Sequence, residues 1–288
     1  MYGCFWVETF SGQAVSVRWR DKEDRYVYYD IVYYDDERYM RDDMEEALEA
    51  TIDQILSRVN GSTPFECALE VHDILCELVT YDKTMSLRHA HDIYGALVNH
   101  LAVCDGYSSA FAYLMLQLGY GVEVVRSENH SWNVVEGTYS DERFVDVTWD
   151  DLDTYDTSAP PSISHDYLFL TEEEMATEKD HTLLESAERT DDGSFNQRYN
   201  YHYVYGRYLD SFDVDLIAGI FQTKMNEGEN YITVRFSNWD DYQRAYNFFC
   251  VGSEELDNFL RTVGYQGRYL VVWKDPLMTI GIELYPPE

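Results

Sequence analysis

Three residues of the sequence have the types and the order needed for catalysis by a thiol nucleophile. Cys104 opens a helical pattern, His130 begins a strand pattern, and Asp146 lies in the next strand pattern. The thiolate is the reactive form of cysteine, and a helix N-terminus or a neighbouring imidazolium favours it. A histidine can take the thiol proton, and a carboxylate can hold that histidine in the right tautomer. The sequence therefore predicts a Cys-His-Asp triad in which Cys104 is the nucleophile, His130 the base and Asp146 the orienting group.

The other cysteines lack this setting. The five cysteines, at positions 4, 67, 76, 104 and 250, are odd in number and form no CxxC motif. This count argues against both a disulfide framework and a structural zinc site. Cys67 and Cys76 fall inside a helical pattern and are interpreted as packing residues. The triad residues supply only three ligands, and His89 and His91 form a weak pair, so no metal and no cofactor are expected. The remaining histidines are interpreted as structural: His72, His100, His165, His181 and His202.

Periodicity predicts the elements that must position the triad. Residues 4–35 have the alternation of strands, with Ser11-Gly12 as a hairpin turn. Thr63-Pro64-Phe65-Glu66 is a capping box with proline at the first helical position. The predicted helices cover residues 42–59, 63–80 and 104–118, and the predicted strands after them cover 121–126, 130–136 and 143–149.

The hairpin between the last two strands must place His130 and Asp146 on one face of the sheet. This requires a loop of odd length, centred near Thr138 or Tyr139, or a bulge. With Tyr139 at the centre, His130 faces Thr148 and Asp146 faces Trp132. His130 and Asp146 then become diagonal neighbours about 7–8 Å apart at the backbone.

The rest of the chain reads as a second, smaller α+β region. Residues 150–165 are interpreted as a loop, and Thr171 caps a short helical turn after a strand. The polar segment 186–197 is interpreted as a linker. A strand at Tyr199–Tyr208 and a helix at Asp213–Glu227 begin a β-α-β-α-β-β order. Three parts are expected: N-terminal strands (1–41), a catalytic domain (42–190) and a C-terminal α+β domain (198–288).

Three segments of the sequence resemble the blocks of the transglutaminase-like superfamily: AVCDGYSSAFAYLMLQLGY, NHSWNVVEG and FVDVTWDD. VHDILCELVTYD and IYGALVNHLAVC also resemble the lead-in of bacterial members, and the resemblance covers roughly residues 65–181. It implies an α+β, papain-like core in which the nucleophile helix packs on an antiparallel sheet. It also implies that Cys104, His130 and Asp146 are the triad.

The same resemblance implies further site residues. The oxyanion hole would pair the backbone N–H of the cysteine with an upstream donor, for which Tyr94 is favoured over Asn99 and His100. Asp105 suits the first helical turn, and Trp132 and Trp149 are expected to wall the site. The calcium sites of animal transglutaminases do not map onto the chain, because DVTWDDLDTYD lacks the spaced ligands and glycine turn of an EF-hand.

Composition limits the partners. The net charge of −33 disfavours nucleic acid and anionic lipid and suits cationic peptides or amines, although solubility alone explains it more simply. No apolar run could span a bilayer, and MYGCFWVETF is no signal peptide, so a soluble protein is expected, extracellular or cell-surface if the chain is trimmed.

The predicted function is cysteine-dependent acyl transfer on peptide or protein amides through a thioester. Hydrolysis, as in a cysteine protease or amidase, is favoured over amine cross-linking. The alternative is a non-catalytic binding or scaffolding module with the same fold.

Overall fold

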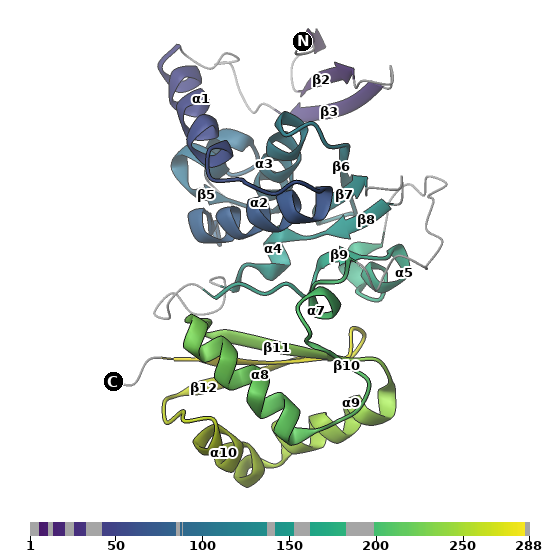
Figure 1. Cartoon of the computed structure of the whole chain (residues 1–288). Helices are drawn as coiled ribbons and strands as arrows, with labels where there is room; N and C mark the ends of the chain where they lie inside the picture. Colours follow the sequence, from purple (N-terminus) through teal and green to yellow (C-terminus); the bar gives the residue numbers. More distant parts are fainter. Residues whose placement is uncertain are drawn as a thin grey trace. The chain divides into compact units, whose positions relative to one another are not determined.

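Helices and mainly antiparallel sheets make up the chain, which confirms the predicted mixture of α and β structure (Figure 1). The structure is a computed structural model and describes residues 6–10, 14–20, 26–32, 42–84, 87, 89–136, 142–152, 162–182 and 199–285. Residues 1–148 and 180–191 form one compact unit, and residues 149–179 and 192–288 form another. The domain bounds expected from the sequence stay a prediction, and the linker 186–197 lies outside the described residues.

The N-terminal strands form a three-stranded antiparallel sheet in the order β1-β2-β3. The strands are β1 (Trp6–Phe10), β2 (Ala14–Arg20) and β3 (Tyr26–Val32). The antiparallel pairing of β1 and β2 includes the pair Phe10 and Ala14. The expected Ser11-Gly12 turn itself falls outside the described ranges.

Two amphipathic helices follow, as predicted. Helix α1 (Asp42–Leu56) buries Leu48, Ile52 and Ile55, which recur at helical spacing. Helix α2 (Pro64–Leu78) begins with the predicted capping box: the backbone N–H of Glu66 donates to Oγ1 of Thr63 at 3.2 Å, and the backbone N–H of Thr63 donates to Oε2 of Glu66 at 3.1 Å. These two bonds satisfy donors that a helix start leaves unpaired.

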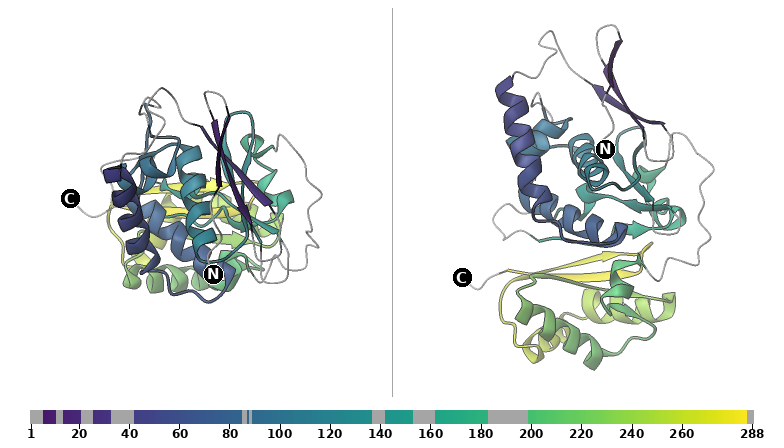
Figure 2. Two further views of the ribbon diagram at one scale, coloured as in Figure 1. Left: turned by 90° about the horizontal axis from the view of Figure 1, so that it is seen from above. Right: turned by 45° about the horizontal axis from the view of Figure 1, so that its top comes forward.

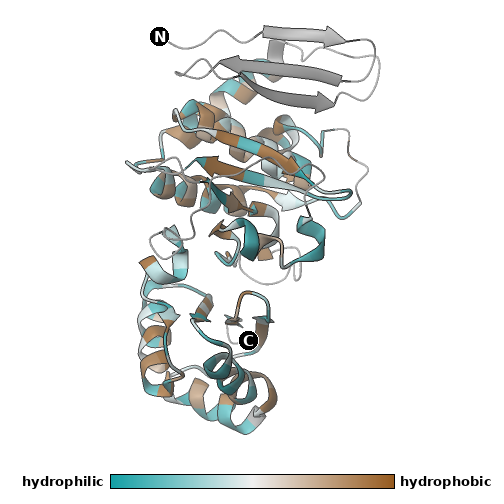
Figure 3. Cartoon of the chain, turned by 90° about the vertical axis from the view of Figure 1, so that its right-hand side faces the viewer, coloured by the Kyte–Doolittle hydropathy of each residue, from teal (hydrophilic) through white to brown (hydrophobic). Residues whose placement is uncertain are grey.

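Helix α3 (Cys104–Gln117) packs on a sheet in which β6 (Val122–Arg126), β7 (Ser131–Glu136) and β8 (Glu142–Val145) are successive neighbours. Tyr107, Phe111 and Leu114 on its inner face are fully buried. Figure 2 shows the helices and strands of this unit from two more directions, and Figure 3 shows the apolar residues of its strands. The short strands β4 (Thr80–Tyr81) and β5 (Leu101–Ala102) pair in parallel, and a π-helical turn, η1 (Gly95–Asn99), precedes β5.

The hairpin of β7 and β8 has the predicted register. Val134 pairs with Phe144, and Glu136 pairs with Glu142, which is the register predicted for a hairpin centred on position 139; residues 137–141 lie outside the described ranges. The predicted length of the second strand is wrong. β8 ends at Val145, and a short helix, α4 (Val147–Asp150), takes up residues expected to be extended. The β-branched and aromatic residues Val147, Thr148 and Trp149 favour a strand locally, so tertiary contacts override this preference.

The second unit contains β9 (Leu168–Leu170) and α5 (Glu172–Met175), with a second capping box at Thr171 and Glu174. Its main sheet has the order β10-β11-β13-β12, from β10 (Tyr208–Leu209), β11 (Tyr231–Phe236), β12 (Tyr269–Lys274) and β13 (Thr279–Leu284). The helical segments are α8 (Val214–Glu227), α9 (Trp239–Tyr246), η4 (Asn247–Val251) and α10 (Ser253–Thr262). A core of apolar side chains, including Ile217, Phe221 and Ile232, joins helices and sheet.

The strand expected at Tyr199–Tyr208 is wrong. Residues Tyr201–Val204 form a helical turn, α7, and only Tyr208 and Leu209 are extended. The side chain of Asn200 accepts the backbone N–H of Tyr203 at 3.3 Å, which caps this turn, and Gly206 ends it with φ of 68°. Within the described residues, no helix combines the length and the apolar character that crossing a membrane requires.

A buried charge cluster ties the segment around Asp166 to the sheet of the same unit. Asp166 is 1% exposed and accepts from Nζ of Lys274 at 2.6 Å. Nε2 of His202 lies 3.2 Å from the other carboxylate oxygen and 2.8 Å from Oγ1 of Thr233. Burial raises the pKa of Asp166, but Lys274 and His202 outweigh burial and hold that pKa well below its usual range. The carboxylate therefore stays charged inside the unit.

Candidate active site

Helix α3 begins at Cys104, whose side chain is half-buried. β5 leads directly into the helix, and the backbone N–H of Val103 donates to the carbonyl of Ala90 at 2.8 Å. Gly106 fits this crossing because a Cβ there would lie 2.6 Å from the carbonyl oxygen of Ala90 and 2.7 Å from Cβ of Ala102. A glycine two residues after Cys104 therefore lets the start of the helix pack closely against the incoming chain.

His130 stands one residue before β7, and Asp146 stands one residue after β8. Nε2 of His130 donates to Oδ2 of Asp146 at 2.6 Å, and the two side chains are 8% and 1% exposed. Cys104 lies near enough to His130 to act on the charge of the imidazole and raise its pKa. Since Asp146 occupies Nε2, the ring nitrogen that remains for the sulfur is Nδ1. The structure thus brings the three predicted triad residues together.

The imidazole and the carboxylate stabilise each other's charged forms. Burial lowers the pKa of His130, but the charge of Asp146 and its hydrogen bond, with a smaller contribution from Cys104, outweigh burial and raise that pKa to about 10. Burial raises the pKa of Asp146, but His130 and His181 outweigh burial and hold it well below the usual range. The pair is therefore an imidazolium and a carboxylate at neutral pH.

Hydrogen bonds join α3, which begins at Cys104, to β7, which follows His130. Nδ2 of Asn133 donates to the carbonyl of Ser108 at 2.9 Å, and Oγ of Ser108 donates to Oγ of Ser131 at 3.1 Å. All three polar residues are buried. Ser131 follows His130 directly, so these contacts hold the base close to the helix of Cys104.

Trp132 and His181 pack around the imidazole. The rings of His130 and Trp132 are nearly parallel, at 18° with centroids 5.8 Å apart. The ring of His181 meets Trp132 edge to face at 4.8 Å, and Trp132 is 1% exposed. Trp132 shares a side of the chain with His130 because side chains two residues apart in a strand point the same way.

His181 is a site residue that the sequence reasoning missed. Its Nε2 donates to Oδ2 of Asp146 at 2.7 Å, and its side chain is fully buried. His181 belongs to the 3-10 turn η3 (Lys179–His181), 35 residues after Asp146 in the chain. No periodicity links these two positions, so only the tertiary structure could reveal the contact.

The other residues expected at the site have the following positions. Nδ1 of His91 lies 3.0 Å from Oδ2 of Asp105, and Nε of Arg126 lies 3.5 Å from Oδ1. The ring of Tyr94 packs edge to face on His89 at 5.3 Å. Trp149 belongs to the second unit, where its ring packs on Tyr167 at 5.1 Å.

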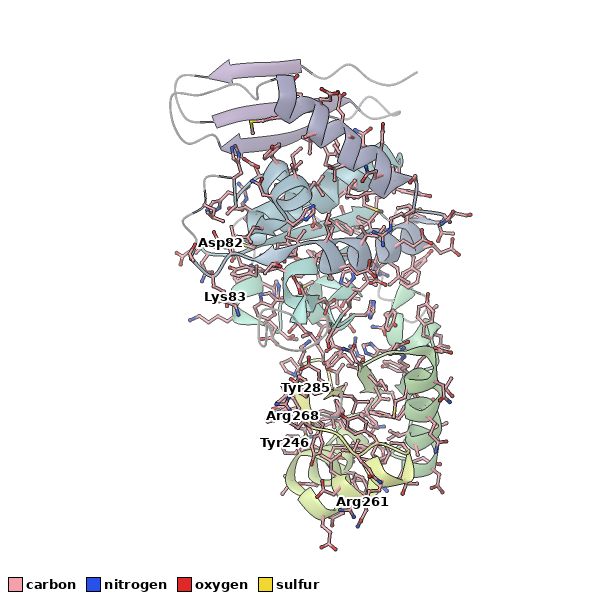
Figure 4. The ribbon with its side chains drawn as sticks, turned by 90° about the vertical axis from the view of Figure 1, so that its left-hand side faces the viewer. Asp82, Lys83, Tyr246, Arg261, Arg268 and Tyr285 are labelled. Atoms are coloured by element: carbon pink, nitrogen blue, oxygen red, sulfur yellow. The ribbon has the colours of Figure 1, made fainter. Side chains whose placement is uncertain are left out.

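Tyr81 is a second neighbour of the thiol that the sequence reasoning missed. It pairs with Ala102 at the end of β4, immediately before Asp82 and Lys83 (Figure 4). Burial raises the pKa of Tyr81, and the next cause is the charge of Cys104. The negative charges of Cys104, Asp82 and Asp105 act together with burial against ionisation of this phenol.

The histidines and the carboxylate could also be considered as metal ligands. One atom from each of His130, Asp146 and His181 lies within 4.8 Å of the others. Both nitrogen-to-oxygen distances, 2.6 and 2.7 Å, are those of hydrogen bonds. Tetrahedral zinc with ligands at about 2.0–2.1 Å would separate the ligand atoms by about 3.3 Å, so this arrangement does not fit zinc.

Comparison with known proteins gives little guidance. No protein-family model matches the sequence, and no curated protein matches it significantly. A crystal structure of a TGase aligns with 39% of this chain at 16% identity and a TM-score of 0.35. A crystal structure of menin, which reveals its binding site for the Mixed Lineage Leukemia (MLL) protein, aligns with 78% at 14% identity and a TM-score of 0.33. The chain spans 34% and 58% of their lengths, and likeness this low carries no argument about fold or function.

Proposed function

We propose that the chain is a cysteine-dependent acyl-transfer enzyme with a papain-like core, acting on peptide or protein amides through a thioester. The observation that supports this proposal most strongly is the position of His130, which is hydrogen-bonded to Asp146 and near enough to Cys104 for the sulfur to raise the pKa of the imidazole. A thiol beside a histidine that a buried carboxylate orients is the arrangement that thiol nucleophiles require.

The reaction would proceed in two halves. In the first, the sulfur of Cys104 attacks the amide carbon as a thiolate beside the protonated His130, and His130 then gives its proton to the departing amine. The backbone N–H groups at the start of α3 can stabilise the oxyanion; Tyr94 remains our candidate for the second donor. In the second half, water attacks the thioester, His130 takes its proton, and the thiol and a carboxylic acid are released.

Hydrolysis is favoured over cross-linking because water needs no binding site of its own. An amine acceptor must compete with water, and it would need recognition beyond the triad. The acidic surface could attract cationic peptides or amines without selecting between these two outcomes. The second experiment below therefore asks whether the acyl acceptor is water or an amine.

The first test is alkylation of the thiols by iodoacetamide at neutral pH, mapped by peptide mass spectrometry. Cys104 should react at least tenfold faster in the wild type than in His130→Ala, because the imidazolium favours the thiolate. Cys250 is an internal control: burial raises its pKa to about 11, so it should stay slow in both proteins. Equal rates at Cys104 in wild type and variant would refute the catalytic proposal.

The second test identifies the acceptor. The wild type is incubated with mixed peptides and a primary amine, and the masses of the products are measured by mass spectrometry. A hydrolysed peptide supports the hydrolase, an amine adduct supports cross-linking, and a trapped thioester supports both. If Cys104→Ala changes none of the products, the non-catalytic binding module becomes the better hypothesis.

A further inference from the structure

We propose that His181 is a positioning residue of the active site, which holds the Asp146 carboxylate in the orientation that His130 needs. This inference rests on the proposed function, since it assigns a role within the same triad. It adds a fourth member to the site, contributed by a segment that no triad motif includes.

The need for a second anchor follows from the position of Asp146 in the chain. β8 ends at Val145 and α4 begins at Val147, so the backbone of Asp146 belongs to neither element. A carboxylate in this position can rotate unless other groups hold it.

The contact geometry supplies this anchor. Oδ2 of Asp146 accepts Nε2–H of His130 at 2.6 Å and Nε2–H of His181 at 2.7 Å. Two donors on one oxygen fix both the torsion of the carboxylate and the direction in which it faces His130. Bulk solvent does not reach this contact, because the side chain of His181 is fully buried and that of Asp146 is 1% exposed.

Trp132 makes the two histidines part of one packed cluster. Its ring is parallel to His130 and perpendicular to His181, and the two imidazole centroids lie 5.2 Å apart. A shift of His181 would therefore disturb both the Asp146 carboxylate and the packing of Trp132 against His130. The titratable groups that act on Asp146 include His130, His181 and Tyr81, and those that act on His130 include Asp146 and Cys104.

The test compares two substitutions that separate hydrogen bonding from packing. His181→Phe keeps a ring against Trp132 but removes the N–H donor. His181→Gln places an amide N–H near the position of Nε2 and keeps the donor. The readout is the rate of Cys104 alkylation by iodoacetamide from about pH 6 to about pH 10, because this rate reports the thiolate without any knowledge of the substrate.

We expect His181→Phe to slow alkylation about tenfold near pH 6, the size of effect that loss of a hydrogen bond to a charged group produces. His181→Gln should stay within about twofold of the wild type. All three proteins should converge near pH 10, where a cysteine ionises without an imidazole. A purely structural defect would instead change the rate at every pH.

The outcomes separate this inference from the function on which it rests. If the wild type exceeds His130→Ala but equals His181→Phe at every pH, the triad stands and the role of His181 is refuted. If the wild type equals His130→Ala, the proposed function itself fails. Protection of Cys104 by one equivalent of zinc that is lost in His181→Phe would show a metal site and would also overturn the positioning role.

Discussion

At the scale of single residues, the site depends on one buried carboxylate. Asp146 stabilises the protonated form of His130 against the opposing effect of burial, and it raises the pKa of that imidazole to about 10. The residue types and the hairpin register of this pair were predictable, because Cys104, His130 and Asp146 appear in order at motif spacing. His181 was not predictable, since its contact depends on a return of the chain that no local pattern encodes.

The substitution Asp146→Asn tests this electrostatic coupling. The amide has similar size but no charge, so the pKa of His130 should fall from about 10 towards its ordinary value of about 6.5 or below, because burial remains. NMR titration of the imidazole would measure the change. Turnover should fall about 10³–10⁴-fold, as expected when the orienting group of a triad loses its charge. An unchanged imidazole titration would contradict the coupling.

At the scale of elements, α3 and the hairpin of β7 and β8 position Cys104, His130 and Asp146. The start of α3 and the capping box of α2 are local features, so the sequence predicted both. The end of β8 was mispredicted because Val147, Thr148 and Trp149 have high strand propensity, yet they form α4. The prediction of a strand around Tyr201 was also wrong, because Asn200 caps a helical turn there.

The substitution Gly106→Ala tests the close approach at the start of α3. The new Cβ would lie 2.6 Å from a backbone oxygen, so the helix start must shift. We expect a loss of about 1–3 kcal/mol in the free energy of unfolding, the usual cost of overpacking, and slower alkylation of Cys104.

Gly219 in α8 provides the matched control. It is exposed, and a Cβ there would meet nothing within 4 Å. Gly219→Ala should therefore stabilise the protein by about 0.5–1 kcal/mol through helix propensity. Urea unfolding of the two variants should give opposite signs; a stabilising Gly106→Ala would refute the packing argument.

At the scale of the whole molecule, the buried cluster around Asp166 joins segments that are distant in sequence. Asp166 contacts Lys274 and His202, and Glu174 accepts from Arg235 at 2.5 Å. The sequence predicted a small α+β region after residue 198, but these long-range ion pairs involve residues separated by 61 and 108 positions. No periodicity could reveal them.

The substitution Asp166→Asn should destabilise the full chain by about 3–5 kcal/mol at pH 7, because it removes the charge of a buried carboxylate from its ion pair with the partly exposed Lys274. The sign of the pH dependence follows from the lowered pKa of Asp166. Its contribution is present above the unfolded value of about 3.9 and is lost as the pH falls further. The stability difference between wild type and variant should therefore shrink in acid, as measured by urea unfolding. Asp166→Asn with Lys274→Met should recover much of the loss.

The two units are interleaved along the chain. The first unit continues to Thr148, the second takes Trp149–Lys179, the first resumes at Asp180, and the second follows from Asp192. A fragment ending at residue 190 would thus retain Asp166 and Glu174 but lose Lys274 and Arg235, the cations that neutralise them. No single cut of the chain separates the two units. During synthesis, the ribosome must release His181 before the Asp146 carboxylate can gain its second hydrogen-bond donor.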